Sequence, residues 1–457
     1  MSDAYLEERH HQLRGLVRAF AESKIAPRIA DMEHSGAVET ELVAAVAQQG
    51  WIGVTIDEVY GGMGAGHLAK TLVIEELSRI SGAMGAAVQA SQLGVAKIIH
   101  FGSDRQKDHW LPKVADGSVL PTIAVTDPEA GSHVLGMRMT ARREGRHYVL
   151  NGTKVYVGNS HIGHLHGVVA RTGNGSQGLT AFLVEADRPG LTVPPHGKTL
   201  GLHGFSFGEL RFTDCRIPAG NRLGREGQGR DVAYSSSVLY GRPNLTAVAL
   251  GIHQAILEQT TAFAGERVRY GSPLHDLPNI KIKIGQIQSR VMTARLTAYH
   301  AAHLLDRGMP CDAELMNAKL INVELALDSA RAAMEIHAAA GLLSDIPLGR
   351  LLRDAHHLFA PAGTSDIQLL RLAEFALGQN KGQWSQRLPT ALSRTPIPLT
   401  RPDQRRPPPG SPRPGADQPL QQSTCRTAVS PASASCPPPD TGGQRPCSRQ
   451  CLAPPGA

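Results

Sequence analysis

Apolar positions recur at helical spacing along residues 1–120. In the segment 5–26, Leu6, Leu13, Val17 and Phe20 are separated by seven, four and three residues, which is the spacing of one buried face of an amphipathic helix. The same kind of pattern predicts further helices over residues 40–49, 67–81, 83–100 and 104–116. We therefore expect residues 1–120 to form an N-terminal all-α domain.

The pattern changes to period two after Pro121. Short stretches of alternating apolar and polar residues are separated by turns rich in Gly, Asn, Asp and Pro; they cover residues 146–151, 154–157, 167–171, 180–185, 191–194 and 209–215. Alternation with breaks of this kind is typical of half-buried strands in antiparallel sheets. It predicts a middle antiparallel β-domain over residues 121–225.

Long helical patterns return after Gly224. They cover residues 230–266, 277–307, 313–340, 348–358 and 365–377, with short connections between them. Several long amphipathic helices with short joins predict a C-terminal four-helix bundle over residues 226–385. The predicted fold class is thus α+β, with an all-α domain, a β-domain and a helical bundle in that order.

Residues 386–457 have a different composition. This stretch holds 17 of the 31 prolines, no aromatic residue, and nine arginines against three aspartates. Such a segment cannot bury enough apolar surface to offset its ordering entropy, so we expect a disordered tail. The other residues carry 38 basic and 37 acidic side chains, and this balance gives no electrostatic reason to expect a nucleic-acid partner.

Cysteine usage and hydropathy point to a cytoplasmic protein. The two cysteines before the tail, Cys215 and Cys311, lie far apart in the sequence, which favours a reducing compartment. The tail cysteines lack CxxC spacing, so we expect no metal. The chain has no apolar run of about 18 residues and no apolar segment behind its polar start, so we expect neither a membrane span nor a secretory signal.

Four motifs occur in a fixed order within residues 125–368. They read VTDPEAGS at 125–132, LNGTKVYV at 150–157, ERVRYGSPL at 266–274, and Gly341 followed by RDA at 353–355 and GTSDIQ at 363–368. Together they resemble motifs of the acyl-CoA dehydrogenase family, on the same order of α, β and α domains. The resemblance implies an FAD-dependent oxidoreductase that acts on an acyl thioester of CoA or of a carrier protein by α,β-dehydrogenation.

The same resemblance implies partners and an assembly. Family members pass their electrons to an electron-transfer flavoprotein or to oxygen, and they are usually homotetramers. We therefore expect an acyl thioester as substrate, one of these two electron acceptors, and a homotetramer assembled through the helical bundle.

The resemblance also assigns residues to the flavin site. It places Thr126 and Tyr156 near the isoalloxazine ring, with Gly158 where the family has a threonine that hydrogen-bonds flavin N5. The FAD phosphates are assigned to Ser132, and to Arg267 and Tyr270 of a neighbouring subunit. Gly363, Thr364 and Asp366 are assigned to the flavin end, and Arg242 matches an arginine beside the catalytic carboxylate.

Residue chemistry is compatible with these assignments. The turn at residues 130–132 offers backbone N–H groups to an anionic phosphate. Gly363 and Thr364 stand at a predicted helix start, where free N–H groups and the helix dipole favour anions. Arg267 is a permanently charged planar donor suited to pyrophosphate. Each residue also has an ordinary interpretation, as a turn former, a helix N-cap or one half of a surface ion pair.

The sequence departs from the family pattern at the catalytic base. Removal of a weakly acidic α-proton needs a carboxylate in a dry site, where burial raises its affinity for protons. The family's usual glutamate position, nine residues after Arg353, is Ala362, and the minority position before Arg242 is Gly241. Both positions therefore lack a base.

Three hypotheses follow from the missing glutamate. In the first, an acyl-thioester dehydrogenase uses a relocated base, and the candidates are Glu129, Asp231, Tyr240 and Asp366. In the second, the protein is a flavin-dependent monooxygenase or oxidase on the same scaffold, where reduced flavin and oxygen do the chemistry without an α-proton base. In the third, it is a non-catalytic member that binds an acyl group or a partner.

Overall fold

The computed structural model describes residues 2–379 and 382–386. The N-terminal part is helical, with α1 at Glu8–Phe20, α2 at Ile29–Ser35, α3 at Thr40–Gln48, α4 at Gly66–Ile80, α5 at Gly82–Phe101 and α6 at Asp104–Ala115. The segment 5–26 is not one helix, because a π-helical turn at Ala21–Ile25 follows α1. α6 begins with a capping box, in which the Ser103 hydroxyl accepts from the Gln106 N–H and the Gln106 side chain accepts from the Ser103 N–H.

The middle part is an eight-stranded sheet with the order β6-β7-β3-β2-β4-β5-β8, and β1 pairs with β4. The strands are β1 at Pro121–Ala124, β2 at Thr140–Glu144, β3 at His147–Gly158, β4 at Leu165–Arg171, β5 at Leu179–Glu185, β6 at Leu191–Thr192, β7 at Phe207–Pro218 and β8 at Arg222–Leu223. The sheet is not antiparallel throughout, because β1 and β4 run parallel. The two predicted strands 146–151 and 154–157 are a single strand, β3, whose pairing with β7 is interrupted by two register shifts.

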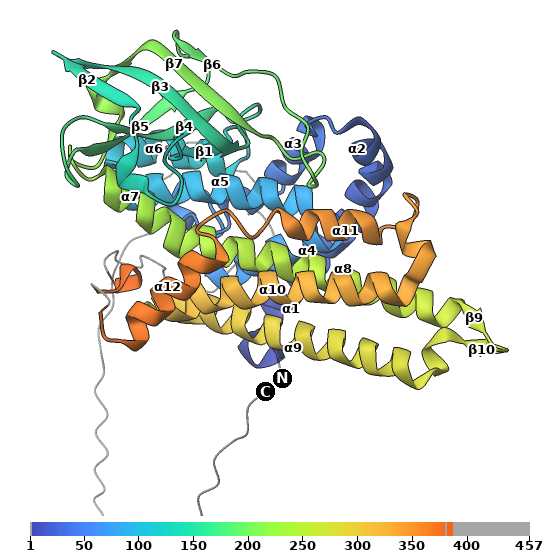
Figure 1. The fold of residues 1–457 in the computed structure, drawn as a ribbon. Helices are drawn as coiled ribbons and strands as arrows, with labels where there is room; N and C mark the ends of the chain where they lie inside the picture. Colours follow the sequence, from blue (N-terminus) through green and yellow to red (C-terminus); the bar gives the residue numbers. More distant parts are fainter. Residues whose placement is uncertain (1, 380–381, 387–457) are drawn as a thin grey trace, which may run out of the picture. The chain divides into compact units, whose positions relative to one another are not determined.

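The C-terminal part contains long helices and a small hairpin. The elements are α7 at Gly229–Ser236, α8 at Arg242–Glu266, β9 at Val268–Arg269, β10 at Ser272–Pro273, α9 at Pro278–Asp306, α10 at Asp312–His337, α11 at Leu348–His356 and α12 at Ser365–Ala376. α8 packs against α9, α10 and α4, and α10 also packs against α11 and α12. Figure 1 shows the sheet lying over α5, with the long helices on the other side of α5.

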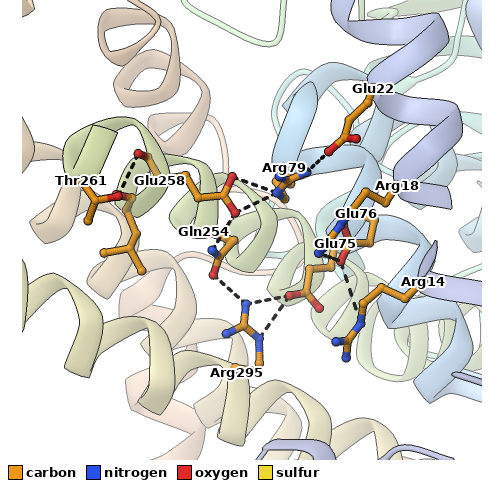
Figure 2. A network of polar contacts seen from close by, with 11 residues as sticks. Arg14, Arg18, Glu22, Glu75, Glu76, Arg79, Gln254, Glu258, Thr261 and Arg295 are labelled. Carbon is orange, nitrogen blue, oxygen red and sulfur yellow. Dashed lines mark hydrogen bonds and ion pairs between the residues drawn. The ribbon is translucent and has the colours of Figure 1, made fainter. Parts of the chain in front are cut away.

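A network of ion pairs joins α4 to its neighbours. Glu75 and Glu76 are both buried; Glu76 accepts two hydrogen bonds from Arg18, and Glu75 accepts from Arg295 and from the Tyr299 hydroxyl. Figure 2 shows Arg18, Glu76, Glu75 and Arg295 close together, and Arg79 between Glu22 and Glu258, to both of which it donates. Leaving a buried charge unpaired is costly, so these pairs hold the N-terminal helices against the bundle.

The predicted fold class is confirmed for the part of the chain that the structure describes. The tail predicted at residues 386–457 lies outside the described residues, apart from Gln386. No described helix is both long and apolar enough to cross a membrane.

Candidate active site

An aromatic ring stands uncovered at one edge of the sheet. Tyr156 lies at the second register shift of β3, has a φ of 58° and is 68% exposed. Its ring stacks on Phe207, with centroids 5.7 Å apart. The N–H of Val155 donates to the carbonyl of Thr126 at 2.9 Å, so the turn that begins at Thr126 lies at the same edge as Tyr156.

A buried ion pair holds that turn in place. Asp127 is 2.5 Å from the Lys154 ammonium, which is fully buried, and it also accepts from the Met139 N–H at 2.9 Å. Burial lowers the pKa of Lys154 to about 8, and Asp127 opposes this shift. The ion pair holds the turn so that Gly131 and Ser132 are exposed and their backbone can contact a ligand. Sequence reasoning had assigned no role to Asp127 or Lys154.

The position of Gly158 leaves no room for a threonine. A Cβ atom there would lie 2.7 Å from the Cβ of Ala90 on α5 and 3.0 Å from the ring of Phe205. The close approach of α5 to β3 therefore explains why this chain has glycine where the family has a side chain that reaches the flavin.

The loop between α11 and α12 forms another part of the candidate site. Ala362 and Gly363 both have left-handed backbones, with φ of 54° and 98°. The Gln368 amide donates to the carbonyls of Ala362 and Gly363, at 2.9 and 3.0 Å. The buried Lys319 ammonium donates to the carbonyls of Phe359 and Gly363, at 2.7 and 2.9 Å, so the loop is held on both sides.

The two positions that lack a base meet in space. A Cβ atom added to Gly241 would lie 3.1 Å from the Cβ of Ala362. Gly241 ends a π-helical turn, Ser237–Gly241, between α7 and α8, and such turns occur often at functional sites. A glutamate from either position would therefore start from nearly the same point.

A cavity of about 740 Å³ lies beside these elements. Its lining comes from the loop before β2, from α7, α8, α10 and α12, and from the C-terminal segment 382–386; charged members are Arg230, Arg242, Asp312, Arg371 and Glu374. Arg242 is only 8% exposed, and its Nε has no hydrogen-bond partner. Burial lowers the pKa of Arg242 to about 10.

The four candidate bases lie in different surroundings. Glu129 is exposed and 2.5 Å from Arg138, Asp231 lies 3.4 Å from Arg230, and Asp366 is exposed in the first turn of α12. Tyr240 is buried, with its hydroxyl 3.4 Å from His100 Nε2 and Lys70 over its ring at 4.3 Å. Burial raises the pKa of Tyr240, so its phenol stays protonated near neutral pH and is not available to accept a proton.

Arg267 and Tyr270 lie far from the other predicted site residues of the same chain. They belong to the segment around the β9–β10 hairpin, whose turn contains Tyr270 at φ 53° and Gly271 at φ 82°. Tyr270 is 93% exposed. Figure 1 shows the hairpin projecting from the end of the bundle, away from the sheet, so within one chain these residues do not join Tyr156 and Ser132.

Comparison with protein-family models identifies three matches in order. They are the acyl-CoA dehydrogenase N-terminal domain at residues 7–118, the middle domain at 122–215 and the C-terminal domain at 227–377. An acyl-CoA dehydrogenase of Bacillus subtilis (strain 168) is 35% identical over 369 residues, which are 80% of this chain and 97% of that protein. The chain belongs to the acyl-CoA dehydrogenase family, and it is an oxidoreductase by that relationship.

Solved structures agree with this assignment. Butyryl-CoA dehydrogenase from Megasphaera elsdenii matches with a TM-score of 0.80 and 29% identity, over 81% of this chain and 99% of that one. A glutaryl-CoA dehydrogenase from Mycobacterium smegmatis in complex with FADH2 matches with a TM-score of 0.77 and 26% identity, over 82% and 96%. The prolyl acyl carrier protein oxidase AnaB matches with a TM-score of 0.76 and 28% identity, over 81% and 99%.

FAD is the cofactor that this family membership indicates, and the residues present fit it. The uncovered ring of Tyr156 offers a flat surface to a planar ligand. The exposed backbone at Gly131 and Ser132 offers N–H groups to phosphate. The start of α12 at Thr364, whose hydroxyl accepts from the Ile367 N–H at 3.4 Å, provides a second set of free N–H groups.

Proposed function

We propose that this protein is an FAD-dependent acyl-thioester dehydrogenase, acting on an acyl group carried by CoA or by a carrier protein. The observation that carries the proposal is the convergence of Gly241 and Ala362, at 3.1 Å, beside a cavity that contains the buried Arg242. Bound FAD would supply a two-electron oxidant for the β-carbon of the acyl group.

The residues of the chain would hold and orient the two reactants. Thr126, Ser132, Tyr156 and Thr364 would bind FAD at the edge of the sheet and at the start of α12. The cavity beside Arg242 would take the thioester, and its apolar members Val238 and Met316 would exclude water from the acyl group. Arg267 and Tyr270 would act on the FAD of a neighbouring subunit.

The proposal includes a slow proton step. Neither Gly241 nor Ala362 provides a carboxylate, and the candidate bases Glu129, Asp231 and Asp366 are at least partly exposed, so none of them lies in a dry site. We therefore infer that the chain holds the acyl group without an efficient base of its own.

The proposal is tested by anaerobic mixing of the purified holoprotein with a panel of acyl-CoA and acyl-carrier thioesters. Loss of flavin absorbance with formation of the enoyl thioester is expected, at a low rate, and an electron-transfer flavoprotein and oxygen are then compared as acceptors. Absence of any flavin reduction over the panel would contradict the proposal. The relatives described above are dehydrogenases and an oxidase, so neither a monooxygenase nor a non-catalytic function is favoured.

A further inference from the structure

Arg242 is a buried cation without a partner. Its guanidinium forms no hydrogen bond or ion pair with any residue that the structure describes, although the residue is 8% exposed and lines the cavity. Burial of an uncompensated charge is costly. A group that completes the site from outside the chain would remove that cost.

The other charges of the cavity are already satisfied. Arg371 lies 2.6 Å from Glu374, and Arg230 lies 3.4 Å from Asp231. The buried carboxylate of Asp312 accepts from the backbone N–H groups of Trp384 and Ser385, at 2.7 and 2.9 Å. Arg242 is therefore the charge in this lining whose side chain has no hydrogen-bonded or ion-paired partner among the described residues, although the charge of Asp312 partly opposes the lowering of its pKa.

A second buried cation reinforces the first. Lys319 is fully buried on α10, and its ammonium donates only to backbone carbonyls of the loop that carries Ala362. Burial and then the charge of Arg242 lower the pKa of Lys319, to about 8, which shows that the two cations sense each other. Neither side chain forms an ion pair with a carboxylate of the described chain, although the charge of Asp312 acts on Arg242 and that of Glu324 acts on Lys319.

We propose that Arg242 binds a carboxylate. The preferred substrates are then acyl thioesters that bind with a carboxylate group placed against Arg242. This inference rests on the proposed function and names its substrate class. The carboxylate has two possible sources, a second carboxyl group on the acyl chain or a free small carboxylate bound beside a neutral acyl chain.

The geometry and charge of the cavity favour carboxylate over phosphate. A guanidinium presents a planar pair of N–H groups that matches the two oxygens of a carboxylate, and the Nε of Arg242 is free to form one of these bonds. Asp312 lines the same cavity. Its negative charge would repel a phosphate dianion more strongly than a carboxylate, which carries a single charge.

The test measures equilibrium binding to the full-length FAD holoprotein. Succinyl-CoA and butyryl-CoA have acyl chains of equal length and differ by the terminal carboxylate. We expect succinyl-CoA to bind about 10- to 100-fold more tightly than butyryl-CoA, the range of a hydrogen-bonded charge pair. Arg242→Gln should abolish this preference, Arg242→Lys should keep part of it, and Arg105→Gln, which removes an exposed charge on α6, should leave it intact.

Acetate and inorganic phosphate distinguish the sources. Saturable acetate binding that is lost in Arg242→Gln, without a preference between the two thioesters, would identify a free carboxylate as the occupant. The proposal is overturned if neither acetate nor succinyl-CoA binding depends on Arg242, or if phosphate binds more tightly than acetate through Arg242. The FAD content and thermal midpoint of each variant show whether it is folded. If Arg242→Gln does not fold, Arg242→Lys still tests the site.

Flavin reduction, followed in the same samples, separates the two proposals. Binding of succinyl-CoA that depends on Arg242, without loss of flavin absorbance, would contradict the dehydrogenase function and support the carboxylate site. Flavin reduction by both thioesters at equal affinity, with no acetate binding that depends on Arg242, would support the function and contradict the site.

Discussion

At the scale of single residues, Ala362 is the position where one substitution should change the chemistry most. Its Cβ faces Gly241, and its left-handed backbone is already present with an alanine, so Ala362→Glu adds no new backbone strain. A positioned general base typically accelerates proton transfer by about 10² to 10⁴-fold. We expect Ala362→Glu to raise the rate of flavin reduction by acyl-CoA within that range.

The control is Ala362→Gln, which has the same shape without a base. Stopped-flow measurement of flavin bleaching compares the two variants with the unmodified protein. Equal rates for the glutamate and glutamine variants would show that the space near Ala362 is not where the α-carbon lies. If the unmodified protein is already fast, scanning Glu129, Asp231, Tyr240 and Asp366 should identify a relocated base.

Lys70 provides a second prediction at this scale, on stability. It is fully buried, and its ammonium lies 2.8 Å from His67 Nδ1 and over the ring of Tyr240. Burial lowers its pKa from 10.5 to about 7. Between these two values the unfolded chain binds more protons at this site than the folded chain does, so the free energy of unfolding rises with pH across that window.

Lys70→Met removes this dependence and should stabilise the protein. Because the buried charge is most costly at low pH, the gain in unfolding free energy should shrink by about 2 kcal/mol between pH 7 and pH 9. Denaturant unfolding at the two pH values measures it, with the exposed Lys281→Met as the control. A gain that does not change with pH would mean that Lys70 stays charged in the folded protein.

Residue identities alone predicted part of this site. The absence of a base at Ala362 and Gly241 follows from the resemblance to the family's motifs, which shows where a base is expected, and from counting along the sequence. Their contact depends on how the bundle packs, and the isolation of Arg242 depends on charges contributed by α7, α10 and α12. These facts are relations between distant segments, which no local pattern contains.

At the scale of secondary structure, the segment 382–386 is held by the start of α10. Asp312 accepts from the N–H groups of Trp384 and Ser385, and the Ser385 hydroxyl accepts from the Cys311 N–H. Trp384 stacks on Tyr234 and forms part of the cavity wall. The carboxylate of Asp312 thus fixes one side of the proposed thioester site.

Asp312→Asn should loosen this wall. An amide has only one acceptor oxygen and no charge. We therefore expect the free energy of unfolding to fall by about 1 to 3 kcal/mol and acrylamide to reach Trp384 more easily. Fluorescence quenching measures that access, a parallel Trp384→Phe variant identifies the signal, and the exposed Asp276→Asn is the control. Quenching that is equal in Asp312→Asn and the unmodified protein would contradict a holding role for Asp312.

Periodicity predicted most helices to within a few residues but did not predict the π-helical turn at Ser237–Gly241, because a turn of five residues is too short to stand out in the spacing of apolar residues along 230–266. The parallel pairing of β1 with β4 was not predicted, because alternation along one strand carries no information about the direction of its partner.

At the scale of the whole molecule, the described residues contain every motif assigned to FAD. We expect a chain that ends at Gln386 to bind FAD with the same stoichiometry as the full chain, since no assigned residue lies beyond that point. Absorbance of the purified truncated protein at the flavin bands measures this. A folded but colourless truncated protein, after incubation with excess FAD, would contradict the assignment of the site.

The exposed hairpin leads to a prediction about assembly. The β9–β10 hairpin, with Tyr270 in its turn and Arg267 directly before it, lies at the end of the bundle, away from the sheet, so a role on FAD requires a second subunit. We predict a homotetramer, or at least a dimer, with closed symmetry. Light scattering at micromolar concentration tests it, and the detection of monomers alone would contradict it.

Chemical modification of the buried lysines can be used to follow local opening of this protein. Lys70, Lys97, Lys154 and Lys319 are each at most 1% exposed, in α4, α5, β3 and α10. Because these amines are buried, an acylating reagent reaches them only after the surrounding structure opens. The order in which these four amines become modified would therefore record which part of the chain opens first: N-terminal helices, the contact of α5 with the sheet, the sheet itself, or the bundle.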